Sequence, residues 1–176
     1  MNEVIEIGSA SAKPGEIAEG NILVGNLGGG SEINIPITII NGINPGPCFW
    51  INGGIHGDEP EGILTCSIIK KEISPNKLSG SLILIPVMNV PAMEAAQRGN
   101  PLDTFSHDMN RIYPGREDGY LSERIAHAHK ELMIKYADME ISIHSGGSHS
   151  YLAEAMFSAK DEKTQELARA MGEDWC

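Results

Sequence analysis

Short apolar runs, separated by glycine and proline, fill the first third of the chain. Their β-branched composition predicts strands at residues 4–7, 22–24, 33–40 and 48–52. Around Pro36 isoleucine alternates with polar residues, which predicts a half-exposed strand near a sheet edge, where a residue without an N–H is tolerated. The Asn-Pro-Gly-Pro segment at 44–47 predicts a turn. The glycine-rich stretch at 25–30 favours a hairpin turn over a phosphate loop, because no helical pattern follows it.

The rest of the chain alternates compact apolar runs with segments of helical periodicity. Buried strands are predicted at 49–51, 82–85 and 139–143. Apolar residues recur at helical spacing in 60–72, 122–136 and 161–172, so each of these segments predicts a helix. Pro60 suits a first helical position, Ser122 and Asp161 suit N-caps, and Gly172 suits the end of the last helix.

This alternation of strands and helices predicts an α/β fold. We expect a mostly parallel or mixed central sheet, flanked by helices, in a single domain over residues 1–176 with a β-rich N-terminal part at about 1–47. A composition of 41% hydrophobic and 21% charged residues is that of a folded chain with its own core.

Charge and cysteine content limit the classes of partner and the cellular compartment expected for the protein. The chain has 13 Lys and Arg against 24 Asp and Glu, a net charge of −11 with no long basic run, which argues against nucleic acid as a partner. Three cysteines at irregular spacing fit neither a disulfide framework nor a zinc cluster, and we expect buried, inert thiols in a reducing compartment. With no apolar run of membrane length and no secretory signal pattern, we expect a cytoplasmic protein without a membrane partner.

Two predicted strands end in histidine-bearing segments, at the sheet edge where α/β proteins bind ligands. The strand at 48–52 runs into a glycine-rich bend with His56 and Glu59, and the strand at 139–143 runs into His144. Two imidazoles and a carboxylate are the set that holds a catalytic zinc ion. A His-x-x-Glu pair alone is a weak signal, and a solvated loop is the alternative interpretation.

The remaining histidines are weaker candidates. His127 and His129 lie two residues apart on a helix and so face different directions, which predicts surface positions; His127 can pair with a glutamate one turn away. We expect His107 and His149 to be polar loop residues.

Two arginines in loops rich in glycine and proline suit the recognition of a carboxylate, because a guanidinium offers a planar pair of donors. These are Arg98 and Arg111, the second beside Asn110. The alternative for Arg111 is a local ion pair with Asp103 or Asp108 that stiffens the loop.

Three motifs, taken in order along the chain, resemble the succinylglutamate desuccinylase and aspartoacylase family of the zinc carboxypeptidase superfamily. They are Gly-Ile-His-Gly-Asp-Glu at 54–59, Asp-Met-Asn-Arg at 108–111 and Ile-His-Ser-Gly-Gly at 143–147. The resemblance covers nearly the whole chain and is strongest to bacterial deacylases of N-acylated amino acids. It implies a zinc-carboxypeptidase-like fold, here without the C-terminal strands.

The resemblance also implies roles for single residues. The family's Zn²⁺ ligands match His56, Glu59 and His144, and the arginine that polarises the scissile carbonyl matches Arg98. The pair that grips the carboxylate of a small anionic N-acyl amino acid matches Asn110 and Arg111.

The sequence departs from the family pattern at two places. Family members carry a general-base glutamate on a later strand, which this sequence does not reach before Cys176; Glu154 is a weak substitute. Ser142 stands where the family tends to have an aspartate that orients the third ligand.

These observations leave several functional hypotheses. The leading one is a zinc-dependent deacylase that hydrolyses a small N-acyl amino acid. The alternatives are a metallocarboxypeptidase acting on peptides and a truncated, non-catalytic relative that binds zinc or a carboxylate. A homo-oligomer is a further possibility, in which a second copy completes the site.

Overall fold

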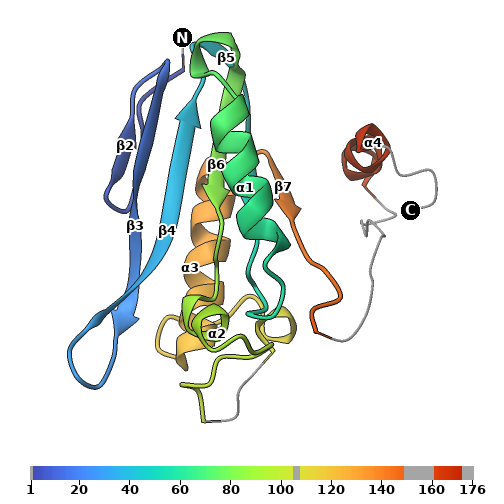
Figure 1. Cartoon of the computed structure of the whole chain (residues 1–176). Helices are drawn as coiled ribbons and strands as arrows, with labels where there is room; N and C mark the ends of the chain where they lie inside the picture. Colours follow the sequence, from blue (N-terminus) through green and yellow to red (C-terminus); the bar gives the residue numbers. More distant parts are fainter. Residues whose placement is uncertain (1, 105–107, 149–160, 172–176) are drawn as a thin grey trace.

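A mixed five-stranded sheet forms the centre of the structure, a computed structural model that describes residues 2–104, 108–148 and 161–171 (Figure 1). The strand order is β3-β4-β6-β5-β7. The strands are β3 (Glu16–Asn26), β4 (Glu32–Asn41), β5 (Asn44–Asn52), β6 (Ser79–Ile85) and β7 (Met139–Ser142). β5 is parallel to both β6 and β7, whereas β4 is antiparallel to β3 and β6, so the predicted mixed sheet is confirmed. Beside it β1 (Ile5–Ile7) and β2 (Ala10–Ala12) form a small antiparallel pair.

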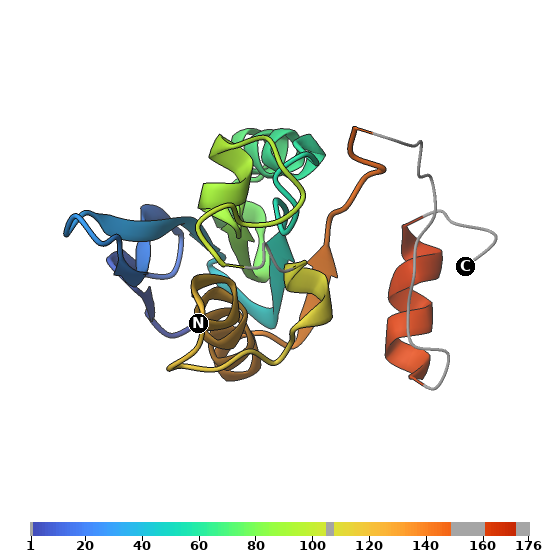
Figure 2. The same ribbon diagram turned by 90° about the horizontal axis from the view of Figure 1, so that it is seen from below.

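Two helices cover opposite faces of the sheet, as the view along the strands shows (Figure 2). α1 (Glu61–Glu72) packs over a small core that contains Ile51 and Cys66. α3 (Leu121–Tyr136) covers the larger core, where Trp50 and Ile125 are fully buried. The shorter elements are α2 (Val90–Glu94), α4 (Glu162–Ala170) and the 3₁₀ turns η1 (Pro75–Lys77) and η2 (Met109–Arg111).

The hairpin between β3 and β4 confirms the turn predicted from the glycine-rich stretch. The position of Pro36 also follows from the pairing of β4. Pro36 pairs with Asn21 of β3, whereas β6 pairs only with the later segment from Thr38 to Asn41. The missing N–H of Pro36 is tolerated because this part of β4 lies beyond the pairing with β6.

Two local predictions are wrong. The Asn-Pro-Gly-Pro segment is not a free turn but begins β5, where Asn44 pairs with Ser79 before a register shift that ends at Cys48. Ser122 is not the N-cap of α3, because the helix begins at Leu121. The N-cap is Tyr120, whose N–H donates to Oε2 of Glu123 at 2.8 Å. The carboxylate of Asp103, in a distant loop, accepts hydrogen bonds from the backbone N–H groups of Leu121 and Ser122, both at 3.0 Å.

At the start of α4 the predicted N-cap is confirmed, since the Asp161 carboxylate accepts a hydrogen bond from the Thr164 N–H at 3.2 Å. Gly172, expected to end this helix, lies outside the described residues. None of the helices in the described ranges has the length and apolar character needed to cross a membrane.

The two cysteines within the described residues are free thiols, with Cys66 buried and Cys48 half-buried. Burial raises the pKa of both thiols to about 11, and the nearby charge of Asp138 adds to the effect at Cys48. Both thiols therefore stay protonated at neutral pH, as expected of inert cysteines.

Candidate functional site

The candidate site lies where two neighbouring strands end. β5 and β7 are parallel and paired, so the segments that follow them emerge at the same edge of the sheet. Two hydrogen bonds tie the strand ends together, from Asn52 Nδ2 to Ser142 Oγ at 3.0 Å and from the Ile143 N–H to the Asn52 carbonyl oxygen at 2.7 Å. This pairing brings His56 and His144 to one point, although they are far apart in the sequence.

Glu59 lies at the centre of the cluster. Its Oε1 is 2.8 Å from Nδ1 of His56, and its Oε2 is 2.8 Å from Nδ1 of His144. The Ser145 N–H donates to Oε2 at 3.1 Å. The potential ligand atoms of His56, Glu59 and His144 all lie within 4.8 Å of one another, and within the described residues they form a group that could hold a metal ion. The side chains of His56 and Glu59 are buried, at 2% and 3% exposed, whereas that of His144 is 19% exposed.

The bend that carries His56 and Glu59 packs closely against α1 and α2. A Cβ atom at Gly57 would lie 1.9 Å from the carbonyl oxygen of Ala92 in α2, and one at Gly53 would lie 2.4 Å from the Cα of Gly62 in α1. Larger residues at these positions would push the bend away from both helices. The glycines on both sides of His56 therefore allow a close approach of the backbone to α1 and α2.

Asp108 links the cluster to Arg98. Its Oδ1 lies 2.9 Å from Nε2 of His56, and its Oδ2 accepts hydrogen bonds from Nε and Nη2 of Arg98 at 3.2 and 3.0 Å. Partial burial pushes the pKa of Asp108 up, but the hydrogen bonds from His56 and the Asn110 N–H, with the charges of His56 and Arg98, outweigh it and hold the pKa below its usual range. Asp108 is thus a carboxylate that fixes one nitrogen of His56. The sequence analysis gave it no such role.

The structure brings Arg98 to the cluster, where its Nη1 donates to Glu59 Oε1 at 3.3 Å. Half of the Arg98 side chain remains exposed, so the guanidinium lies at the rim rather than inside the site. Asn110 and Arg111 lie two and three residues after Asp108, in η2, and both are exposed. Arg111 Nη1 donates to the Asn110 carbonyl oxygen at 3.3 Å.

The carboxylates proposed as local partners of Arg111 have other roles. Asp108 binds Arg98 and His56, and Asp103 accepts hydrogen bonds from the first backbone N–H groups of α3.

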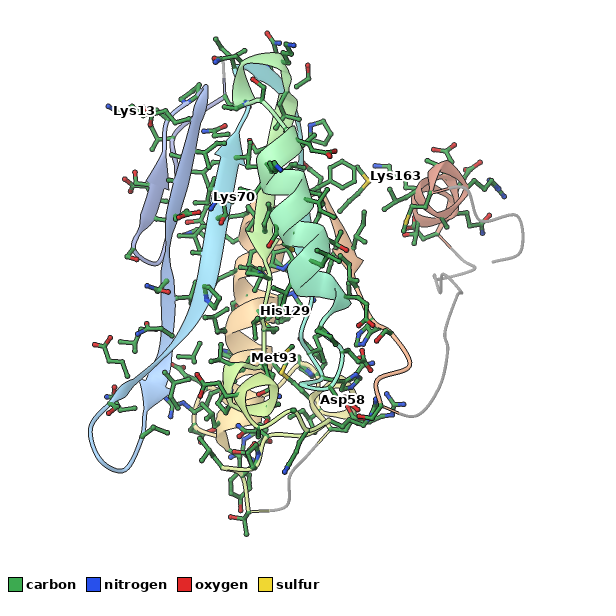
Figure 3. All side chains as sticks on the ribbon, in the orientation of Figure 1. Lys13, Asp58, Lys70, Met93, His129 and Lys163 are labelled. Carbon is green, nitrogen blue, oxygen red and sulfur yellow. The ribbon has the colours of Figure 1, made fainter. Side chains whose placement is uncertain are left out.

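Asp58 is a further residue that the sequence analysis missed. Its Oδ2 accepts hydrogen bonds from the N–H and the hydroxyl of Ser148, both at 3.3 Å, and so joins the bend after β5 to the loop that carries His144 (Figure 3). A Cβ atom at Gly147 would lie 2.5 Å from the same carboxylate oxygen, at a φ of +57°. Only the position of Asp58 beside Glu59 hinted at this role, because its partners lie 90 residues away.

The prediction that His129 is a surface residue is wrong. It belongs to α3, where Figure 3 labels it, and it is only 5% exposed. Its ring stacks on Trp50, and its Nδ1 lies 2.6 Å from the Tyr113 hydroxyl. The signal was present in the sequence, because His129 lies one helical turn after the buried Ile125 and shares its face. His127 is half-buried. His107, His149 and Glu154 lie outside the described residues.

Comparison with known proteins connects this geometry to a family. The sequence profile of the succinylglutamate desuccinylase/aspartoacylase catalytic domain matches residues 45–174. An N-alpha-acetyl-L-2,4-diaminobutyric acid deacetylase of Halomonas elongata is 34% identical over 115 residues, which cover 65% of this chain and 33% of the deacetylase.

Solved structures show the same likeness. A succinylglutamate desuccinylase/aspartoacylase from Rhodobacter sphaeroides superposes with a TM-score of 0.68 at 29% identity, over 74% of this chain and 40% of that protein. The product-bound ectoine utilization protein EutE from Ruegeria pomeroyi gives a TM-score of 0.67 at 27% identity, over 83% of this chain and 44% of that protein. The chain thus spans less than half the length of these relatives.

The profile match includes the bend after β5, the Asp108 loop and the segment with His144. The expected family and the zinc-carboxypeptidase-like fold are confirmed by the matched residues and by the superpositions. The chain therefore belongs to the succinylglutamate desuccinylase/aspartoacylase catalytic domain family.

Proposed function

We propose that the protein hydrolyses the amide bond of a small N-acyl amino acid, or of a related amide, with the help of a zinc ion. The observation that carries this proposal is the convergence of His56, Glu59 and His144 at the carboxyl ends of β5 and β7. The relative from Halomonas elongata is named as a deacetylase of an acetylated amino acid, which supports the substrate class.

The residues fit a zinc ion by their chemistry. Two imidazoles and one carboxylate are the three protein ligands of a common type of catalytic zinc site, which keeps a further position open. Burial of His56 and Glu59 favours a bound cation, since the buried carboxylate then gains a full positive partner. When bound at such a site, zinc activates a water molecule and polarises a carbonyl group.

The protein residues around this cluster have separate tasks in the proposal. Asp108 accepts a hydrogen bond from Nε2 of His56, so it fixes the ring orientation and leaves Nδ1 on the side of Glu59. Arg98 presents a guanidinium at the rim, where it stabilises negative charge that develops on the substrate carbonyl oxygen. Asn110 and Arg111 are exposed on the same loop and bind the substrate carboxylate.

The general base is not assigned among the described residues. Glu154, the weak substitute from the sequence, lies outside them. Ser142 Oγ accepts a hydrogen bond from Asn52, so at this position the chain joins two strand ends instead of presenting a carboxylate. A cytoplasmic location and a homo-oligomer also stay predictions.

The deciding experiment measures zinc content and hydrolysis in parallel. We expect one zinc ion per chain and turnover of N-acetyl-2,4-diaminobutyrate, N-acetylaspartate or N-succinylglutamate, with dipeptides hydrolysed more slowly. Glu59→Gln should abolish both zinc binding and turnover, because the neutral amide is a poor ligand. Glu72→Gln, at an exposed position in α1, is the matched control and should change neither.

Other results would assign other functions. Faster turnover of dipeptides would contradict the deacylase proposal and favour a carboxypeptidase. Stoichiometric zinc without turnover of any of these substrates would favour a non-catalytic relative. Chains that bind no zinc at all would contradict the metal site itself.

A further inference from the structure

A buried imidazole on the α3 side of the sheet contacts three different segments. Nδ1 of His129 lies 2.6 Å from the hydroxyl of Tyr113, and Nε2 lies 3.0 Å from Oε1 of Glu140. The ring also stacks on Trp50, with centroids 5.4 Å apart and planes at 30°. Two aromatic rings and a carboxylate therefore surround one histidine that is only 5% exposed.

Each of these three neighbours belongs to a segment that leads into the candidate site. Trp50 is in β5, which runs into the bend with His56 and Glu59. Glu140 is in β7, which runs into His144. Tyr113 lies two residues after η2, the turn whose N-cap is Asp108. The imidazole therefore contacts the three segments that carry His56 with Glu59, His144, and Asp108, whereas Arg98 comes from a fourth segment after α2.

The two ring nitrogens make different contacts. Nε2 lies 3.0 Å from Oε1 of Glu140, but within the described residues it forms no hydrogen bond. Nδ1 and the hydroxyl of Tyr113 share a hydrogen bond. Burial, together with the charge of Glu140, raises the pKa of Tyr113, so this hydroxyl keeps its proton. Water has little access to either contact, because His129 and Trp50 are buried.

We propose that His129 is a positioning residue, which sets the Asp108 loop against the two strands that carry the candidate ligands. It acts through Tyr113 on the loop and through Glu140 and Trp50 on β7 and β5. The proposal rests on the proposed function, because positioning has a catalytic meaning only if the cluster binds the metal and the loop binds the substrate. Removing the Tyr113 contact should loosen the loop while the sheet stays intact.

The test uses a pair of matched variants. Tyr113→Phe keeps the ring against His129 and removes only the hydroxyl. The control is Tyr136→Phe, which removes another tyrosine hydrogen bond of 2.6 Å, from the end of α3 to the carbonyl oxygen of Glu6. Replacing His129 itself risks the whole core, so the tyrosine variant carries the test.

Hydrogen exchange of the metal-free proteins gives the first readout. We expect Tyr113→Phe to speed the exchange of backbone amides in 108–113 about fivefold, the effect of losing one net hydrogen bond, with β3 and β4 unchanged. Tyr136→Phe should leave 108–113 unchanged. Equal exchange in the two variants, or a uniform increase over the whole sheet, would overturn the proposal.

The second readout is the affinity for Zn²⁺, measured by competition with a chromophoric chelator, with KM and kcat for N-acetyl-2,4-diaminobutyrate. We expect Tyr113→Phe to weaken zinc binding about threefold, less than the loss of a residue that contacts a ligand directly. KM should rise with kcat nearly unchanged, because the loop that binds the substrate is displaced. A wild-type protein that binds no zinc would contradict the proposed function. The hydrogen-exchange comparison would still decide whether His129 positions the Asp108 loop.

Discussion

Asp108 Oδ1 lies 2.9 Å from Nε2 of His56, and the same carboxylate holds Arg98 through its other oxygen. One acidic side chain therefore fixes both a candidate metal ligand and the guanidinium at the rim of the site. The two functions that we propose for these groups depend on a single residue in a loop rather than on the sheet.

Replacement of Asp108 tests this dependence. We expect Asp108→Asn to weaken zinc binding about tenfold, because an amide orients the imidazole less firmly than a carboxylate and does not favour its basic form. The affinity is measured by chelator competition. Asp118→Asn is the control, since this carboxylate is 85% exposed in a surface pair with Arg116. An equal loss in both variants would show that net charge, and not the contact with His56, determines the affinity.

The close approach of the Asp58 carboxylate to Gly147 predicts that position 147 requires glycine. Gly147→Ala should destabilise the loop by about 1–2 kcal/mol, because φ is +57° and the new Cβ would lie 2.5 Å from the Asp58 carboxylate. Zinc affinity should fall with it, as the loop carries His144. Gly29→Ala is the control, since a Cβ there meets nothing within 4 Å. Zinc binding that survives Gly147→Ala unchanged would mean that the loop adapts without moving His144.

The packing of α3 on the larger core predicts that two substitutions in this helix change the free energy of unfolding by different amounts. Ile125→Ala should lower the free energy of unfolding by about 2–5 kcal/mol, because the side chain is fully buried against the sheet. Ile134→Ala on the same helix should change it by less than about 0.5 kcal/mol, as this side chain is 63% exposed. Urea unfolding measures both. Similar values for the two variants would contradict the packing of α3 described above.

The buried thiols predict a loss of stability in alkaline solution. The pKa of Cys66 is about 11 in the folded protein against 9.0 for an ordinary thiol, so the folded state binds the proton more tightly. Its contribution is complete below pH 9.0 and is lost as the pH rises towards 11. Alkylation with iodoacetamide at pH 8 should therefore be slow in the folded protein and fast in urea. Fast alkylation of Cys66 without denaturant would contradict its protected environment.

The sequence predicts most elements of this fold because their signals are local. Helical spacing predicts α1 and α3, and compact apolar runs predict the strands of the sheet. Two of the failures involve a partner from a distant part of the chain. Asn44 enters a strand because Ser79 pairs with it, and Asp103 accepts from the first backbone N–H groups of α3.

In the candidate site, too, some residues could be predicted from the sequence and others could not. The positions of His56, Glu59 and His144 at strand ends predict that they meet. The link from Asp58 to Ser148 spans 90 residues and leaves no pattern in the sequence. The surface prediction for His129 fails because the residue lies four positions after Ile125, on the buried face of α3, while its spacing from His127 says nothing about burial.

The pairing of β7 has a mechanical consequence for this part of the fold. The strand has only four residues, and within the described part of the chain it pairs with β5 alone. A short strand with few pairings opens at low free energy, so β7 should detach from β5 before β5 separates from β6. A metal ion held by His56, Glu59 and His144 would fasten the end of β7 to the end of β5. Loading the metal would then act as a staple that protects β7 from proteolysis and raises the thermal midpoint.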